Sequence, residues 1–383
     1  MMVKMGWFIA AIVAVQACAS HARGDVVERR GGAPSLEGEI TIEDAGVRVR
    51  TRGGAAQLVP WDRVRSVTPR PAGDDFEQRM KLAEELWRAR SRLERGDYAL
   101  AEGIFERHFE LSRGRTDETA LVIAEGLARC RLARLDPALA LIPALEAARM
   151  RRAGINTESY RAMPALIDDA TALCVQLPPA WLASPTTRRL EQELASYDAR
   201  GDEVIASLAS LYRQSIRQQM HGPWQDAVFA EPRGATARHP GVALLRDLVQ
   251  AGAAEPGARE LARGAIARLM DGSGDAPSAW VEAWGRYALG LSLLWEDEPE
   301  RTARGAVHLL HLPARFNDSQ FYLSGLAVAQ VIHMLERKPV SSVAGASSLR
   351  AELDRRYSHH PVHSPAFELS SGRTDRHTTT ENP

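Results

Sequence analysis

Two histidines in the C-terminal third of the chain have the clearest metal-ligand spacing. His308 and His311 stand three residues apart, which places both imidazoles on one face of a helix. His333 is the nearest histidine in the next predicted helix. A zinc site needs a third and usually a fourth ligand, and Leu309 stands where an HExxH protease motif has its general base. We therefore expect packing or surface histidines, and we predict neither a metal site nor another cofactor.

Paired carboxylates occur at Asp168 and Asp169 and in the acidic run 296–298. Neighbouring residues on a helix point in different directions, so the first pair is poorly placed to share a substrate, and the acidic run precedes Pro299 like a solvated helix start. No GxSxG, GxGxxG or GxxxxGK[ST] motif occurs in a supporting context. We predict no catalytic residue, although a catalytic pair distant in sequence would leave no such motif.

The chain has three cysteines. Cys130 and Cys174 both lie in stretches that we predict to be helical. An exported protein could join them in a disulfide, provided that their Cα atoms lie within about 7 Å of each other. We expect two separately buried thiols, and the sequence leaves the disulfide open.

Aromatic residues offer a second kind of site. Trp280, Trp284, Tyr287 and Trp295 recur at roughly helical spacing. Such a row could stack on a sugar or on a proline-rich peptide, but packing between helices is the commoner role. The residues that we select as candidate partner-binding positions are Trp87, Tyr98, Trp224, Trp284 and Trp295.

A repeated stretch shows which elements position these residues. Residues 89–101 read ARSRLERGDYALA and residues 128–140 read ARCRLARLDPALA, thirty-nine positions later, with nine of thirteen residues identical. Apolar residues recur every three or four positions on both sides of the breaks at Gly96 and Leu135. Self-similarity at this spacing is typical of stacked helix pairs.

The first copy resembles the tetratricopeptide repeat. Its pattern residues stand in order at Trp87, Leu93, Gly96, Tyr98, Ala101 and Phe105. The second copy departs from the pattern, because Leu135 replaces the turn glycine and Pro137 replaces the tyrosine. Pro143 lies one turn into its second helix, which could therefore start late or kink. The resemblance implies a mainly α fold of antiparallel helix hairpins, an α-solenoid that presents a curved inner wall to a protein or peptide.

We divide the helical body into tetratricopeptide-like repeats at 76–220, a proline- and glycine-punctuated connection at 221–241 and a second block of helical hairpins at 242–358. Residues 359–383 are polar and threonine-rich, and we predict that they form a disordered tail.

A different texture precedes the helices. Residues 23–68 alternate short β-branched runs with glycine-rich turns, which predicts a small β-barrel-like module. The module loosely resembles SH3-like and Sm-like folds, with Trp61 as the expected core residue or, alternatively, as an aromatic platform for a ligand peptide. Residues 69–75 then form a predicted stiff linker.

The first residues indicate export from a bacterial cell. Lys4 precedes an apolar run at 6–15, and small residues at 17 and 19 flank Cys18, which together predict a signal peptide over 1–22. The alternative is a lipoprotein signal in which Cys18 is acylated, although Gln16 departs from the small residue that such a signal has there. Removal of the signal peptide would leave no segment long enough to span a membrane as a helix.

These observations favour an exported, periplasmic or envelope-associated scaffold that binds an unidentified protein or peptide. A formal net charge of −1 argues against nucleic acid as the partner. The alternatives are a helical-fold enzyme acting on a polysaccharide or peptidoglycan-like substrate, and a lipid-anchored envelope lipoprotein with a structural role.

Overall fold

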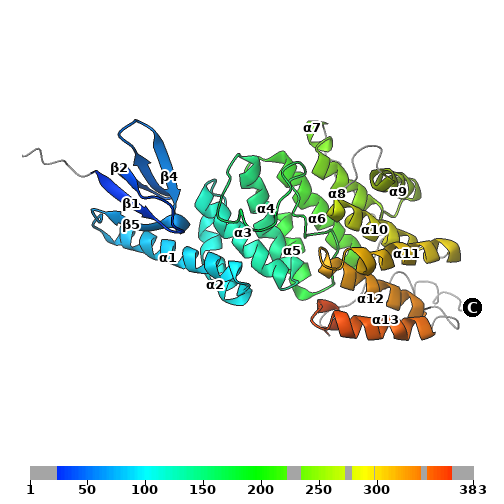
Figure 1. Cartoon of the computed structure of the whole chain (residues 1–383). Helices are drawn as coiled ribbons and strands as arrows, with labels where there is room; N and C mark the ends of the chain where they lie inside the picture. The colour runs from blue at the N-terminus through cyan, green and yellow to red at the C-terminus, as the bar shows by residue number, and fades with distance from the viewer. Residues whose placement is uncertain (1–23, 222–233, 272–277, 297, 338–342, 365–383) are drawn as a thin grey trace, which may run out of the picture.

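The computed structural model describes residues 24–221, 234–271, 278–296, 298–337 and 343–364 (Figure 1). The structure is mainly α-helical, and a small antiparallel sheet precedes the first helix. In Figure 1 the sheet lies at the left with the first two helices beside it, and the later helices lie at the right, from α7 (Gly234–Ala237) at the top to α13 (Val343–Arg356) at the bottom. The predicted signal peptide, with Cys18, lies outside the described residues.

The β module is a five-stranded antiparallel sheet with the strand order β4-β3-β2-β1-β5. A 3-10 turn, η1 (Trp61–Arg63), joins the last two strands. The indole of Trp61 is fully buried and donates to the carbonyl oxygens of Glu43 and Asp44, as expected for a core residue. The strands are β1 (Asp25–Arg29), β2 (Leu36–Glu43), β3 (Gly46–Arg50), β4 (Ala56–Pro60) and β5 (Val64–Thr68).

Two helix hairpins follow the sheet. Their helices are α1 (Asp74–Glu94), α2 (Tyr98–Ser112), α3 (Glu118–Ala133) and α4 (Pro137–Arg152). The repeated stretches 89–101 and 128–140 each cover the end of one helix, the turn and the start of the next helix. Helix α4 begins at Pro137 and continues through Pro143, so the predicted late start does not occur.

The two turns of the repeat have the same backbone hydrogen bonds. The N–H of Gly96 donates to Leu93 O and that of Leu135 to Leu132 O, while the N–H groups of Asp97 and Asp136 reach five residues back. This is the Schellman arrangement, which needs a left-handed residue after the helix. Gly96 has φ 83° and Leu135 has φ 60°, so the second copy keeps the turn without its glycine.

The side chains at the two turns also correspond. Arg92 donates to the carbonyl oxygen of Leu100, and Arg131 donates to that of Leu139. The small residues Ala101 and Ala140 are fully buried, which allows the second helix of each hairpin to approach the first closely. The sequence repeat is therefore a structural repeat.

An irregular segment, residues 153–184, separates the first hairpins from the remaining helices. Many of its large apolar residues are buried without helical hydrogen bonding, and an isolated β-bridge joins Ile167 to Cys174. The prediction that Cys174 lies in a helix is therefore wrong. Asp168 and Asp169 lie in the same irregular segment, where Asp168 accepts hydrogen bonds from Thr171.

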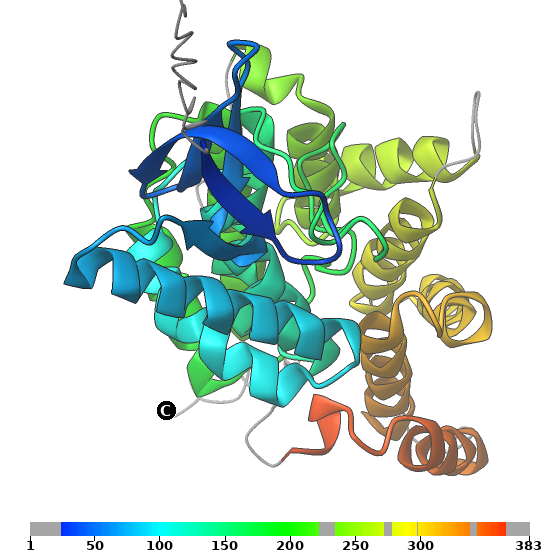
Figure 2. The same ribbon diagram turned by 60° about the vertical axis from the view of Figure 1, so that its left-hand side comes forward.

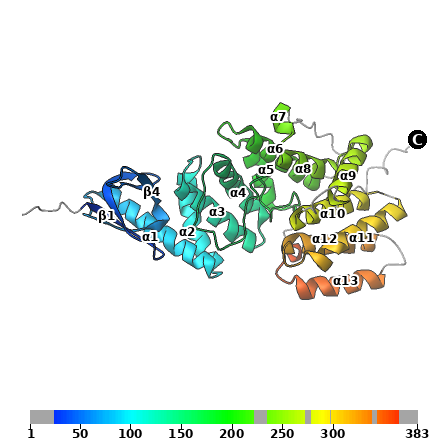
Figure 3. The ribbon, with the colours of Figure 1, turned by 45° about the horizontal axis from the view of Figure 1, so that its top comes forward.

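The second half continues as a row of helices in which each packs mainly on its neighbours in sequence (Figure 3). The tightest crossing is between α10 and α11, where a Cβ on Gly305 would lie 2.7 Å from the carbonyl oxygen of Gly290. The helices are α5 (Pro185–Ala195), α6 (Glu203–His221), α7 (Gly234–Ala237), α8 (Pro240–Gln250), α9 (Pro256–Asp271), α10 (Ala279–Leu294), α11 (Pro299–Arg315), α12 (Phe321–Arg337) and α13 (Val343–Arg356).

Helix α1 belongs to two hydrophobic cores. Phe76 and Ala83 pack with the buried valines of the sheet, whereas Leu86, Ala89 and Leu93 pack with the helices. Figure 2 shows the sheet lying against α1. The extended linker after β5 therefore leads into a helix that holds the β module against the helical body.

A buried ion pair strengthens this junction. The Asp62 carboxylate, with a side chain 0% exposed, accepts from Arg90 at 2.8 Å and from Ser159 at 2.6 Å. These three residues come from η1, α1 and the irregular segment. Burial raises the pKa of Asp62 in spite of the neighbouring guanidinium. The pair therefore ties three parts of the chain together.

Candidate functional site

The largest hollow formed by the repeat lies where the hairpin turns meet the start of α12. It consists of two adjoining spaces of about 480 and 220 Å³ that share Leu135, Pro137 and Tyr322 as walls. We call the two spaces together the hairpin-tip groove. Their combined size is in the range of sites that hold a small ligand or a few residues of a peptide. The lining of the two spaces also includes Tyr98, Arg129, Leu132, Met163, Gln176, Trp181, Ser184, Thr187, Phe321, His359 and Pro361.

One wall of the groove is built from equivalent positions of the repeat. Tyr98 and Pro137 are the first residues of α2 and α4, and Leu135 is the left-handed residue of the second turn. Only a few per cent of residues other than glycine adopt positive φ, and such strain is concentrated at functional sites. The Asp136 carboxylate accepts from Leu139 N at 3.1 Å, and burial raises the pKa of this carboxyl.

The facing wall comes from the irregular segment and α12. Gln320, just before α12, donates to Val175 O at 2.9 Å, and the Tyr322 hydroxyl lies 3.3 Å from Ala180 O. Ser184 accepts from Thr187 N and thereby caps α5 at the edge of the smaller space. These bonds fix the facing wall, so the groove is largely preformed.

Arg129 is a largely buried cation in the wall of the larger space. Its guanidinium donates to Pro164 O at 2.9 Å, lies over the Tyr160 ring and is 3.8 Å from Glu125. Glu125 has a second and closer cation, Arg151, at 2.6 Å. Arg151 also lies 3.9 Å from Asp169, so the two arginines on this side face two carboxylates.

Two exposed leucines occupy equivalent positions of the repeat, although neither lines the groove. Leu100 is 59% exposed and Leu139 is 38% exposed, and each follows the start of its helix by two residues. Single exposed leucines are ordinary. Here the same position is apolar and exposed in both copies, which is a further correspondence between the two hairpins.

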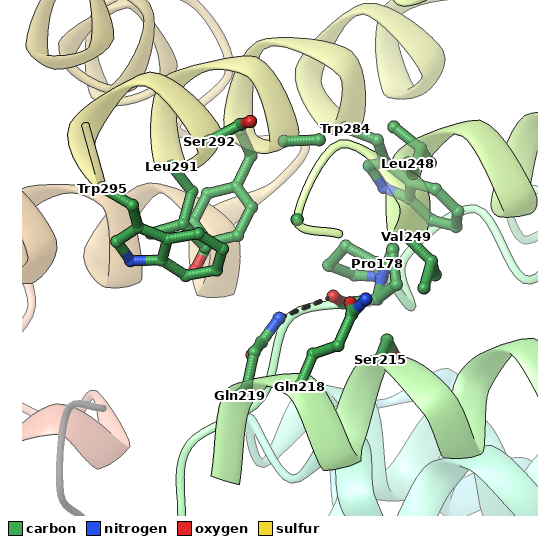
Figure 4. A pocket seen from close by; sticks show the side chains of 14 residues that line it. Pro178, Ser215, Gln218, Gln219, Leu248, Val249, Trp284, Leu291, Ser292 and Trp295 are labelled. Carbon is green, nitrogen blue, oxygen red and sulfur yellow. Dashed lines mark hydrogen bonds between the residues drawn. The ribbon is translucent and has the colours of Figure 1, made fainter. Parts of the chain in front are cut away.

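The predicted site residues divide between the groove and the core. Tyr98 lines the groove, as described above. Trp284 and Trp295 meet at another cavity, enclosed by α6, α8 and α10 (Figure 4). That cavity measures about 30 Å³, which is room for one water molecule and not for a ligand. Trp284 is buried and packs edge-on against Trp280 at 4.8 Å, so it is part of the core.

Trp87 is half-buried at the junction between α1 and the β module. Its ring has the guanidinium of Arg90 at 4.6 Å and that of Arg30 at 5.8 Å. Both cations belong to this chain, so the ring serves an internal contact. Trp224 lies outside the described residues.

The candidate metal and thiol chemistry can be placed in the same way. Within the described ranges, no three His, Cys, Asp or Glu side chains come together in a way that could hold a metal ion. Burial lowers the pKa of His308, and the nearby Arg286 acts in the same direction. Cys130 and Cys174 are free and buried, so they form no disulfide, and burial raises the pKa of each thiol to about 12.

A smaller hollow of about 330 Å³ lies between the β module and the start of α3. Burial raises the pKa of Glu118 in its wall, which is a property of some catalytic acids. The second acidic residue of the wall, Glu158, is paired with Arg63 at 3.1 Å. None of the residues that line this hollow is aromatic.

Several important residues were not among those selected from the sequence. Leu135 could have been found, because it stands where the repeat needs glycine. Tyr322 and Trp181 face the hairpins from more than forty residues away and carry no local signal. The acidic run at 296–298 was expected to be solvated, yet Glu296 is mostly buried between Arg263 and Arg301.

Among the helices that the structure describes, none combines the length and apolar character needed to cross a membrane. Comparison with known proteins found no matching family model, no matching curated protein and no matching solved structure.

Proposed function

We propose that this protein is a non-catalytic scaffold of the bacterial cell envelope whose hairpin-tip groove holds a segment of a partner protein. The observation that carries the proposal is the groove itself, where both copies of the repeat contribute a wall residue at the equivalent positions Tyr98 and Pro137. Stacked helix hairpins present such surfaces to peptides and to helices.

The local geometry supports a tetratricopeptide-like interpretation of the first two hairpins. Their turns share one hydrogen-bond pattern, and the small residues Ala101 and Ala140 occupy equivalent buried positions. The strand order of the β module, with β5 beside β1 and a 3-10 turn before it, supports an SH3-like interpretation of that module.

The chemistry of the groove favours a peptide over a sugar. Apolar side chains from Leu132, Leu135, Met163 and Phe321 dominate its walls, and few carboxylates face it. A sugar-cleaving site would need two opposed carboxyl groups flanking the scissile bond. The hollow beside Glu118 has no aromatic platform and its second acid is paired, so we rank the enzyme alternative below binding.

Export and lipid attachment remain parts of the proposal. Residues 1–22 would direct the chain out of the cytoplasm, and cleavage there would produce a soluble envelope protein or, with acylated Cys18, an anchored one. Mass spectrometry of the mature N-terminus distinguishes the two. If the protein isolated from bacterial cells that export proteins still begins at Met1, export is refuted.

Site-specific photocrosslinking tests the binding role. A photoreactive phenylalanine at Tyr98 or Phe321 should give the same discrete adduct in cells, because both positions line the groove. Leu111 is 80% exposed on the same helix as Tyr98 and serves as the matched control. Adducts of equal yield from all three positions, or none from the groove positions, would refute the proposal.

A further inference from the structure

The C-terminal strap, residues 358–364, closes one side of the smaller space of the groove. His359 and Pro361 line that space together with Tyr322 and Trp181. The sequence predicted that the disordered tail begins at 359, but the strap continues in an ordered path that includes a 3-10 turn, η2 (Pro361–His363). In Figure 1 it lies at the end of α13 that faces the hairpins.

The strap is attached to α12 by one imidazole. His360 is 2% exposed and stacks on the Tyr322 ring at 5.3 Å, with the rings of Phe321 and Tyr357 beside it. The ring occupies the space of an absent side chain on α12, because a Cβ on Gly325 would lie 2.6 Å from His360 Cδ2. This fit explains why the strap docks at this point of the helix.

Both ring nitrogens are used, and they require one neutral tautomer. Nε2 lies 2.8 Å from the carbonyl oxygen of Tyr322 and must donate to it, whereas Nδ1 accepts from Val362 N at 3.2 Å. Protonation would place a second N–H at Nδ1, directed at the N–H of Val362. The docked strap therefore cannot keep its hydrogen bonds when the ring carries a positive charge.

We propose that the strap is a proton-operated gate on the hairpin-tip groove, which is closed while His360 is neutral and released when it is protonated. The device stands on its own geometry, and only its consequence for partner binding rests on the proposed function. Release removes the part of the lining that His359 and Pro361 supply, which widens the smaller space beside Tyr322 and Trp181.

The electrostatic surroundings of the ring agree with this direction. Burial lowers the pKa of His360 from 6.5 to about 4, and the nearby His363 acts in the same sense. The phenols of Tyr322 and Tyr357, on the elements packed against the ring, are neutral in this range, and burial raises the pKa of both. His363 itself faces Asp354 of α13 at 3.7 Å.

The sign follows from these pKa values. The released strap binds a proton near pH 6.5 and the docked strap near pH 4, so docking is strongest above pH 6.5 and weakens as the pH falls toward 4. Between pH 7.5 and pH 5 the equilibrium constant for opening should rise about 30-fold.

Hydrogen exchange of the full chain, compared as protection factors at pH 7.5 and pH 5, measures this opening. The amide of Val362 reports directly, because its acceptor is the titrating nitrogen. We expect the 30-fold loss of protection in the wild type and in the double variant His359→Gln/His363→Gln, in which His360 is the one imidazole of the strap. An unchanged protection factor in the wild type, or loss of the effect in the double variant, would overturn the proposal.

Two further variants separate the gate from general instability. Gly325→Ala should release the strap at pH 7.5, while Gly345→Ala, whose added Cβ would have its nearest neighbour at 3.9 Å, should leave it docked. His360→Gln should remove the pH dependence. A strap that stays protected in Gly325→Ala would contradict the gate even if crosslinking confirms partner binding. A strap that is released in Gly325→Ala, together with no crosslinked partner, would support the gate and refute the proposed function.

Discussion

The left-handed leucine in the second turn allows a test in which the sign of a stability change is set by one backbone angle. Leu135 has φ 60° and its N–H completes the same turn as that of Gly96. Replacing Leu135 by Ala or by Gly removes the leucine side chain from the groove wall in both cases. The two variants differ in the freedom of the backbone, because Ala keeps the strained conformation and Gly adopts it readily.

The expected difference follows from known conformational costs. A left-handed conformation costs a residue with a Cβ about 1–2 kcal/mol. Glycine loses more entropy on folding, which offsets roughly 0.5–1 kcal/mol of that gain. We therefore expect Leu135→Gly to be more stable than Leu135→Ala by about 1 kcal/mol, the reverse of the usual order inside a helix.

Urea unfolding followed by far-UV circular dichroism measures this difference. Gly96→Ala is the matched variant in the first turn, where φ is 83° and an added Cβ would meet nothing within 4 Å. It should lose about 1 kcal/mol for conformational reasons alone. If Leu135→Ala equals or exceeds Leu135→Gly in stability, the two turns are not equivalent and the structural repeat is refuted.

Three further predictions concern the core. Arg90→Met should lower the free energy of unfolding by about 3–5 kcal/mol, because it leaves the buried carboxylate of Asp62 unpaired. Arg88→Met on the same helix breaks an exposed pair and should lower it by about 0.5 kcal/mol. Equal losses of the two variants in urea unfolding would contradict the importance of the buried pair. Gly126→Ala should lower the thermal midpoint of the protein, because its Cβ would lie 2.5 Å from the ring of Phe105. Gly103→Ala, whose Cβ would meet nothing within 4 Å, should raise the thermal midpoint. A rise in both variants would contradict the packing around Gly126. The two buried thiols, each with a pKa near 12, should react with a disulfide reagent at pH 8 only after unfolding, and rapid labelling of the native protein at both would contradict their burial.

The elements that could be predicted from the sequence are those set by local interactions. The turn around Gly96 depends on a few adjacent residues, and the alternating β-branched runs of the module depend on neighbouring strands. Both kinds of signal lie within a short window. The buried role of Trp61 followed from the small size of the module, which needs one large residue to fill its core.

The parts that escaped prediction depend on contacts between distant segments. Cys174 was predicted to lie in a helix, yet Pro164, Pro178 and Pro179 interrupt helical hydrogen bonding and the segment is irregular. The groove was only partly foreseen. Tyr98 could be selected from the repeat, but its facing wall around Tyr322 comes from the other half of the chain.

The dual membership of α1 has a mechanical consequence. One uninterrupted rod carries Phe76 at one end and Leu93 at the other, each locked into a different set of neighbours. A load applied to the strands would be transmitted along the rod with little bending, because no hinge lies between the two anchor points. The module and the hairpins should accordingly tumble, and resist pulling, as a single body.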